Sequence, residues 1–349
     1  MVLDRRLMPR GTPGGVVGGE FLTGRRLERF LGGERDWGHL VLARVASHLY
    51  WLARYIERAE ATARLAIAAS DTILDLPDGI PYDWESLMQV FGSKDPDGPL
   101  TERDVMEQLI LSAEHTGSIR TSIASARENA RVTRDLIPKD AWVALNELHG
   151  QLERQSLAGF DRSTRIRVLK QVISGCRLWH GCLMANQARD LGWVFLRLGD
   201  RLEHADMVSR LVDPRVTQMV PGASARWSSY EAIGWQNLLS ALGGVELYRH
   251  SAKNRLKGAD VLQFVLRDSE FPQSMLAALQ SIKRFLAKLP HQRVPEDLVD
   301  GIATGLAGLD VERISPDLLT ENMDWVQQGL GILHERISTE YFYFDAPRS

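Results

Sequence analysis

The sequence predicts an all-α protein, a multi-helix bundle with a weak internal helical duplication. Apolar residues recur at the 3.6-residue spacing of amphipathic helices through most of the chain. The alternating Val, Ile and Thr runs that are typical of strands are almost absent. A short acidic and basic pattern occurs twice, as Glu57 to Arg64 and, 146 residues later, as Glu203 to Arg210. Together these observations indicate two related helical halves.

The beginning of the chain differs from the rest. Residues 1–40 are rich in Gly and Arg and show little helical periodicity, so we expect a disordered leader. We expect a single helical domain over residues 41–345. We also hypothesise that the native protein starts at Val41, read from a non-ATG codon. N-terminal peptide mapping that detected Met1 would rule this out.

The first strong helix is predicted over residues 43–75. Ala and Arg, which are frequent here, have high helix propensity. Pro77 and Pro81 end this helix, and Thr101 is the expected N-cap of the next one, with Asp104 at the capping-box position. The apolar stripe of the first helix consists of Leu49, Leu52, Ile56, Ala59, Ala63 and Ala66.

Further helices follow in two groups, which Asp213-Pro214 and Pro221-Gly222 separate. Asp268 or Ser269 is expected to cap the helix that starts near Pro272, because proline is favoured in a first turn. The predicted ranges are 101–113, 117–135, 138–153, 161–187 and 190–211, then 227–242, 244–256, 258–267, 272–289, 295–306 and 315–340.

The bulk composition excludes several classes of protein. A net charge of −3 gives no general case for binding nucleic acid or an acidic membrane surface. No apolar run reaches the roughly 18 residues of a membrane span, and no secretory signal is recognisable. The two cysteines, Cys176 and Cys182, form no disulfide framework or CxxC motif and suit a reducing cytosol. We therefore expect a cytoplasmic protein.

The duplicated pattern places charged side chains on one helix face in each copy. Glu60 and Arg64, like Asp206 and Arg210, are i,i+4 pairs in the favourable acid-first order. As exposed salt bridges they would contribute only a few tenths of a kcal/mol. Glu57 and Glu203, however, lie beside the apolar stripe, and if they are buried they need cationic partners.

An arginine row over residues 127–134 is the expected source of those partners. Its like charges share one face, so the row faces solvent, faces carboxylates or binds an anion. We favour docking of this row against Glu57 and Glu203, with Arg54 as a further cation. The candidate charged layer is Arg54, Glu57, Glu60, Arg64, Arg127, Arg131, Arg134, Glu203, Asp206 and Arg210.

No metal site or cofactor is predicted. Ferritin-like centres need Glu-x-x-His pairs, whereas Glu57 and Glu203 are followed at that spacing by carboxylates. Cys176 and His180 are i,i+4 on one helix, but no second ligand pair accompanies them. The common nucleotide-binding and hydrolase motifs, such as GxGxxG, Walker A, HExxH and GxSxG, are also missing.

Five stretches of the chain carry a family resemblance: residues 49–60, 126–131, 142–146, 199–206 and 271–274. With them, the chain resembles the bacterial Alpha-E domain family over about residues 41–345. Two positions depart from the family pattern: His204 stands where the second copy resembles Glu-Arg-Ala-Asp, and Gln273 stands where the turn resembles Phe-Pro-Arg-Ser. Both departures remove a cation.

The resemblance implies an all-helical cytoplasmic protein. It also implies partners, a circularly permuted ATP-grasp-type ligase and a transglutaminase-like cysteine peptidase, and thus a system of peptide synthesis or modification. It implies no catalytic residue.

Three functions stay open at this point. The first, which we favour, is a non-catalytic partner that binds such a ligase or its peptide through the charged layer. The second is an enzyme that modifies a peptide or small molecule, with Glu57 or Glu203 as general base poised by Arg131 or Arg54. The third is a structural oligomer held together by the same layer.

Overall fold

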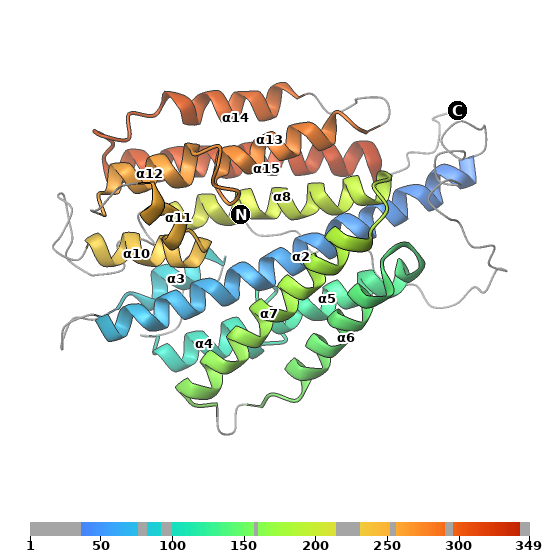
Figure 1. Cartoon of the computed structure of the whole chain (residues 1–349), viewed down its shortest axis with the longest axis horizontal. Coiled ribbons are helices and arrows are strands. Elements are labelled where there is room, and N and C mark those ends of the chain that lie inside the picture. The colour runs from blue at the N-terminus through green and yellow to red at the C-terminus, as the bar shows by residue number, and fades with distance from the viewer. Residues whose placement is uncertain are drawn as a thin grey trace.

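Two long helices lie side by side at the centre of the structure, which is a computed structural model (Figure 1). Helix α2 spans Asp36–Asp75 and helix α8 spans Leu191–Val212. All regular elements in the described part of the chain are helical, which confirms the predicted all-α class. The structure describes residues 36–75, 82–91, 100–156, 160–213, 231–251, 256–289 and 296–342.

One group of helices follows α2 in the chain and packs on its side of the centre, in the lower half of Figure 1. Helices α5 and α7 both lie against α2, and α6 packs against both of them. This group consists of α3 (Trp84–Val90), α4 (Glu102–Leu111), α5 (Ile119–Val132), the 3₁₀ helix η2 (Arg134–Leu136), α6 (Lys139–Glu153) and α7 (Arg162–Asn186).

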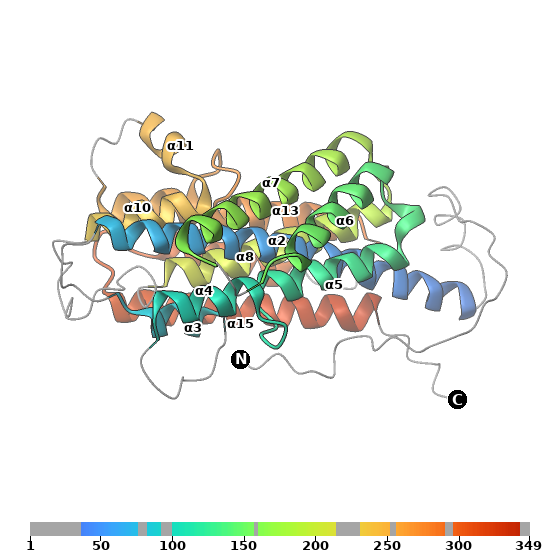
Figure 2. The same ribbon diagram turned by 90° about the horizontal axis from the view of Figure 1, so that it is seen from below.

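A second group follows α8 and repeats this arrangement. Helices α13 and α15 lie against α8, and α14 packs against both of them. Figure 2 shows α7 and α15 on opposite sides of the α2 and α8 pair. The group consists of α10 (Glu231–Leu242), α11 (Val245–His250), α12 (Gly258–Arg267), α13 (Met275–Leu286), α14 (Asp297–Gly308) and α15 (Pro316–Tyr341).

The loops before α5 and α13 repeat the duplication at the level of single hydrogen bonds. Ser112 Oγ accepts two backbone N–H groups of its own turn, and Asp268 Oδ1 does the same in the second half. Ser118 and Ser274 are the N-caps of the two following helices. Each N-cap hydroxyl also donates to the carbonyl oxygen six residues earlier, at 2.5 Å in both loops. The two halves therefore share their turn chemistry as well as their helix order.

Glycine allows α8 to approach α2 very closely. A Cβ atom at Gly199 would lie 2.9 Å from the carbonyl carbon of Tyr50, which is a backbone atom that cannot turn aside.

The predicted apolar stripe of α2 is buried as expected, so this face belongs to the core: Leu49, Leu52, Ile56, Ala59, Ala63 and Ala66 are all at most 1% exposed.

Most predicted helices agree with the structure to within a few residues. The capping box of α4 is confirmed, because the side chains of Thr101 and Asp104 accept each other's backbone N–H groups. The cap predicted at Asp268 or Ser269 is wrong, since α13 begins at Met275 behind Ser274. Helix α3 is too short, at seven residues, to produce a recognisable periodic pattern.

Some expectations fall on residues that the structure does not describe. Residues 1–35 of the expected leader lie outside the described ranges, whereas residues 36–40 belong to α2. Residues 227–230 and 252–255, predicted as parts of two helices, and 343–345 also lie outside them. Across the described ranges, no helix combines the length and the apolar character that crossing a membrane requires.

Candidate functional site

Glu203 of α8 is held by two arginines of α2. Arg54 Nε donates to Glu203 Oε2 at 2.7 Å, and Arg58 Nε donates to Oε1 at 2.5 Å. Residues 54 and 58 are one helical turn apart, which places both guanidinium groups on the same face. Burial opposes ionisation of the carboxyl, which is 1% exposed, but Arg58 and Arg54 outweigh it and lower the pKa of Glu203 to about 2. Glu203 is therefore a buried, fully ionised carboxylate.

An aromatic shell encloses this arginine pair. The Arg54 guanidinium lies 4.9 Å from the Trp51 ring centroid, and Arg58 lies 5.6 Å from that of Tyr55. Tyr50 is 2.9 Å from His334 Nδ1, on α15. Burial, helped by the charge of Arg54, lowers the pKa of His334 to about 3, so its neutral ring accepts a hydrogen bond from the Tyr50 hydroxyl.

The reverse pairing holds Glu57: here α2 supplies the carboxylate, and His204 of α8 binds it. Nδ1 of His204 lies 2.8 Å from Glu57 Oε1, and Nε2 donates to the carbonyl oxygen of Gln273 at 3.0 Å. Because a carbonyl oxygen only accepts, Nε2 carries a proton. The contact between Nδ1 and Oε1 holds one further proton, so the pair has no net charge. Burial opposes ionisation of Glu57, but the hydrogen bond and charge of His204 outweigh it and lower the pKa of Glu57.

The two motifs therefore exchange partners across the α2 and α8 contact. Each glutamate is bound by the residue that follows the other glutamate: Arg58 binds Glu203, and His204 binds Glu57. The exchange is reciprocal, as expected for a duplicated element. It is not equal, because the first copy supplies arginine and the second supplies histidine.

A second asymmetry lies one turn earlier. Arg54, which binds Glu203, corresponds in the second copy to Asp200, and a carboxylate cannot pair with Glu57. Asp200 is 1% exposed, and its Oδ2 accepts from Arg197 at 2.7 Å and from Arg201 at 2.9 Å. Burial opposes its ionisation, but these two arginines lower the pKa of Asp200 far below the ordinary value. The other oxygen, Oδ1, has no hydrogen-bond partner.

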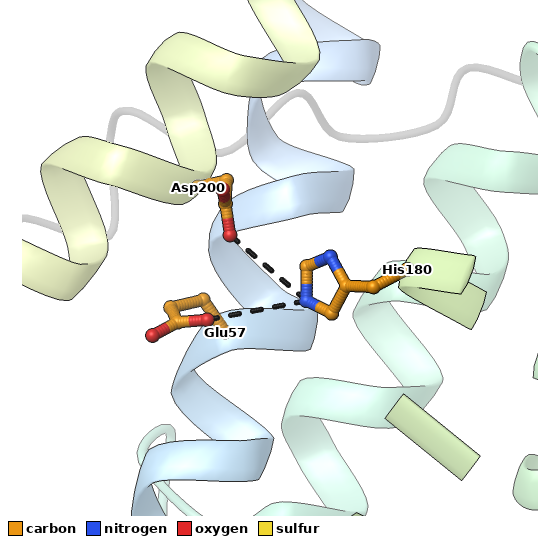
Figure 3. A group of neighbouring side chains, drawn as sticks. All are labelled: Glu57, His180 and Asp200. Atoms are coloured by element: carbon orange, nitrogen blue, oxygen red, sulfur yellow. Dashed lines mark ion pairs between the residues drawn. The ribbon is translucent and has the colours of Figure 1, made fainter. Parts of the chain in front are cut away.

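His180 of α7 completes this half of the site (Figure 3). Its Nε2 atom lies 4.0 Å from Glu57 Oε2 and 3.9 Å from Asp200 Oδ1. Both distances exceed a hydrogen bond, so the imidazole stands between two carboxylates without bonding to either. Three helices, α2, α7 and α8, thus bring Glu57, His180 and Asp200 together.

A cavity of about 390 Å³ opens beside this cluster. Glu57, His180 and His204 line it, together with the loop residues Pro272 and Gln273. Its cationic lining consists of Arg64, Arg177, Arg197 and Arg201, and Glu60 lies among them. Glu203 does not line the cavity. Glu57 of the first copy therefore faces a polar cavity, whereas Glu203 of the second copy is buried in the core.

Two predicted pairs are confirmed. Arg64 Nε donates to Glu60 Oε1 at 3.0 Å, and Arg210 Nε donates to Asp206 Oδ2 at 2.9 Å. Glu60 also has Arg177 within 3.6 Å. Glu60 lies in the cavity wall, so its pair with Arg64 belongs to the site.

The predicted docking of the arginine row on the carboxylates is wrong. Arg127 donates to Asn146 at 2.7 Å, Arg131 pairs with its own helix neighbour Glu128 at 2.6 Å, and Arg134 lies over the Trp142 ring. Helix α5 does pack on α2, but it turns these side chains toward α6 and solvent. The carboxylates bind arginines and a histidine of the central helices instead.

The predicted layer misses several residues of the site. Arg58 binds Glu203, and His204 and His180 lie within 4.0 Å of Glu57. Asp200 lies beside His180 and pairs with Arg201. Aligning the two copies places Asp200 opposite Arg54 and His204 opposite Arg58, and this loss of two cations was the available signal. His180 comes from a helix outside the repeat and leaves no such signal. Cys176, one turn before it, is buried, and burial raises the pKa of its thiol well above the ordinary value.

Fold and site together define a class of protein: an all-helical chain of two related halves, whose central helices exchange buried charges beside a polar cavity. Glu57-Arg58, a Glu-Arg dipeptide, lies at the centre of that exchange. The chain belongs to the Alpha-E family, described as a predicted alpha-helical domain with a conserved ER motif, which matches residues 41–342.

Relatives of this chain occur in mycobacteria. An uncharacterized protein of Mycobacterium bovis and two of Mycobacterium tuberculosis strains are each 23% identical to it over 316 residues. The match covers 82% of this chain and 35% of each relative, so the chain spans about a third of their length. No solved structure matches the chain.

Proposed function

We propose that this chain is a non-catalytic ligand-binding component of an ATP-grasp-type peptide synthesis or modification system. Its ligand is a peptide or amino acid that enters the cavity beside Glu57 with a free carboxylate. The observation that carries this proposal is the cavity lining, where arginines from three helices converge: Arg64, Arg177, Arg197 and Arg201.

The charge balance of the cavity favours an anion. Its four arginines face three carboxylates: Glu60, which Arg64 and Arg177 share, Asp200, which Arg197 and Arg201 share, and Glu57. Arg177 is the most accessible of the four, with its side chain 60% exposed and Glu60 3.6 Å away. Guanidinium groups bind carboxylates through paired hydrogen bonds, so Arg177 is the first contact we assign to the ligand.

The same cavity also suits an ammonium group. Glu57 lines the cavity, and its Oε2 atom lies 4.0 Å from His180, too far to accept a hydrogen bond from it. A ligand with both a carboxylate and an amine, such as an amino acid or a short peptide, complements arginines and carboxylates at once. A simple inorganic anion would use only half of this lining.

The partners proposed for the chain are a circularly permuted ATP-grasp-type ligase and a transglutaminase-like peptidase. The buried charges of α2 and α8 are inside the fold, so they are not the surface that such a partner would contact. Support for the partners comes from the family resemblance alone. Co-purification of the tagged chain with each enzyme, followed by size-exclusion chromatography of the mixture, tests this arm separately from ligand binding.

Isothermal titration calorimetry tests the ligand. The probes are the dipeptide Ala-Glu and its doubly amidated form, which lacks both free carboxylates. We expect the free dipeptide to bind and the amide to bind at least about tenfold more weakly, because a charge-assisted hydrogen bond contributes about 1.5–3 kcal/mol. Arg177→Ala should weaken the free dipeptide similarly. Arg103→Ala, on the exposed Glu107 pair of α4, is the matched control.

Equal affinity for both forms of the dipeptide, or no binding of either, would contradict the proposal. An enzyme is the second candidate, because Glu57 lines the cavity and is hydrogen-bonded to His204, as a general base would be. Mass spectrometry of the dipeptide after incubation distinguishes the two. Turnover that disappears in Glu57→Gln would favour the enzyme over the binding component.

A further inference from the structure

Glu57, His180 and Asp200 present three atoms that lack close partners at the edge of the cavity. Glu57 Oε2, His180 Nε2 and Asp200 Oδ1 all lie within 4.8 Å of one another. Asp200 is 99% buried, yet its Oδ1 atom makes no hydrogen bond. A buried, ionised oxygen without a partner is costly, so this arrangement calls for a further group between the three side chains.

We propose that these three residues bind a divalent transition-metal cation. The proposal goes beyond the peptide ligand: a metal here occupies Glu57 Oε2, the oxygen that otherwise faces the amine of the ligand, and the test below uses the metal alone. A point equidistant from the three atoms lies about 2.5 Å or less from each of them. Zinc bonds to nitrogen and oxygen are about 2.0–2.2 Å long, so rotations that move each atom by a few tenths of an ångström close the site.

The remaining atoms of the cluster are already arranged as supports for the ligands. Glu57 Oε1 is bonded to His204, and Asp200 Oδ2 is bonded to Arg197 and Arg201. Each carboxylate therefore has its outer oxygen fixed by a neighbour and its inner oxygen open. Hydrogen bonds of this kind orient ligating carboxylates in metal sites. Arg197 and Arg201 also balance the negative charge of the Asp200 carboxylate.

The donor set selects the class of metal. One imidazole and two carboxylates suit Zn²⁺, Mn²⁺ or Fe²⁺, whereas Mg²⁺ and Ca²⁺ prefer oxygen ligands alone. Three protein ligands leave coordination positions open. Glu57 and His180 also line the cavity, so those positions face its interior, where a ligand atom could occupy them.

The metal explains why Glu57 lacks an arginine pair like the one that Arg54 and Arg58 form around Glu203. At Glu203, two arginines neutralise the carboxylate, and Arg54 fills the place that Asp200 takes beside Glu57. His334, which faces the Glu203 end, bonds Tyr50 instead of standing open between carboxylates. The same framework is thus closed by cations at one end and left open for a cation at the other.

The test is calorimetric titration of the full chain with ZnCl₂ or MnCl₂ after removal of bound metal with EDTA. We expect one equivalent to bind. His180→Gln and Asp200→Asn should each weaken binding at least about tenfold, because replacing even the hydrogen-bond partners of metal ligands costs about 10–100-fold in affinity. His149→Ala, a histidine of α6 away from the cavity, is the matched control and should bind as the parent does. Far-ultraviolet circular dichroism confirms that each variant is folded.

Cobalt replacement supplies a second readout that does not depend on affinity. Co²⁺ bound to this site should show visible d–d bands and no sulfur-to-metal charge transfer. Charge transfer would assign the metal to Cys176 or Cys182 and overturn the proposal. Absence of stoichiometric binding by the parent, or unchanged affinity in both ligand variants, would overturn it as well.

Discussion

Replacing Glu203 with glutamine removes one negative charge from a fully buried site and leaves Arg54 and Arg58 facing an amide. The amide oxygen can accept from one arginine, but its NH₂ group faces the donor of the other. Both guanidinium groups are at most 10% exposed, so water compensates neither of them well. The substitution keeps the size of the side chain, so the measured cost reports the charge rather than a cavity.

Two estimates of the loss in unfolding free energy caused by Glu203→Gln agree. The folded-state pKa of Glu203 is about 2, against an ordinary value of 4.5, and each pH unit of this difference corresponds to about 1.4 kcal/mol, or about 3 kcal/mol in all. Breaking a buried ion pair by removing one partner costs about 3–5 kcal/mol. We therefore expect Glu203→Gln to lower the free energy of unfolding by about 3–4 kcal/mol at pH 7.

Urea denaturation followed by circular dichroism measures this loss. Glu128→Gln is the control, because its partner Arg131 and Glu128 itself are more than half exposed, and such pairs contribute at most about 1 kcal/mol. The stabilising effect of a depressed carboxyl pKa is complete above pH 4.5 and is lost as the pH falls toward about 2. The difference in unfolding free energy between the parent and Glu203→Gln should therefore shrink as the pH falls from 4.5 toward about 2. A loss as small as that of Glu128→Gln would refute the reasoning.

Three further predictions follow from the packing and the pKa values. Gly199→Ala should lower the free energy of unfolding by about 1–3 kcal/mol or more in urea denaturation, because its Cβ would meet the Tyr50 backbone. Gly181→Ala, whose Cβ meets nothing, should be neutral or stabilising by up to about 1 kcal/mol, and equal effects of the two would contradict the close contact. His334 has its pKa lowered to about 3 from 6.5, so the unfolded chain binds more protons in between and stability should fall by about 3 kcal/mol from pH 6.5 to about 4. His334→Gln should flatten that dependence, and an unchanged profile would refute the assignment. Cys176 should resist a thiol reagent in the folded chain and react in urea, since it is buried with a raised thiol pKa, and rapid modification of the native protein would show that its burial is wrong.

Local features of the sequence predicted most of the fold. Helical periodicity located α2 and α8, and the acid-first spacing identified Glu60–Arg64 and Asp206–Arg210, because both signals depend on neighbours within one helix.

Contacts between helices were harder to predict. The row over residues 127–134 was the favoured partner of Glu203, and Arg58 was not considered, since periodicity does not say which helices dock or in which rotation. The short interhelical approach at Gly199 decides the outcome, because it brings α8 within reach of arginines on α2 itself.

The candidate site was predictable only in part. The repeat identified Glu57 as a candidate. The sequence also predicted that Glu57, if buried, needs a cationic partner. No metal site was predicted, because the repeated motif lacks histidine at the ligand spacing and no second ligand pair accompanies Cys176 and His180. His180 of α7 meets Glu57 and Asp200 only in three dimensions. Ligand sets that draw one residue from each of several helices leave no spacing signature in a single sequence.

The central claim is that the two copies of the motif have diverged, one closed by arginines at Glu203 and one open to ligands at Glu57. A crystal structure of the zinc-soaked protein, with anomalous data at the zinc edge, tests it most directly. We expect an anomalous peak bonded to Glu57, His180 and Asp200, and none beside Glu203. Zinc bound at a cysteine or at a surface histidine instead, with Asp200 Oδ1 turned onto an arginine, would contradict it.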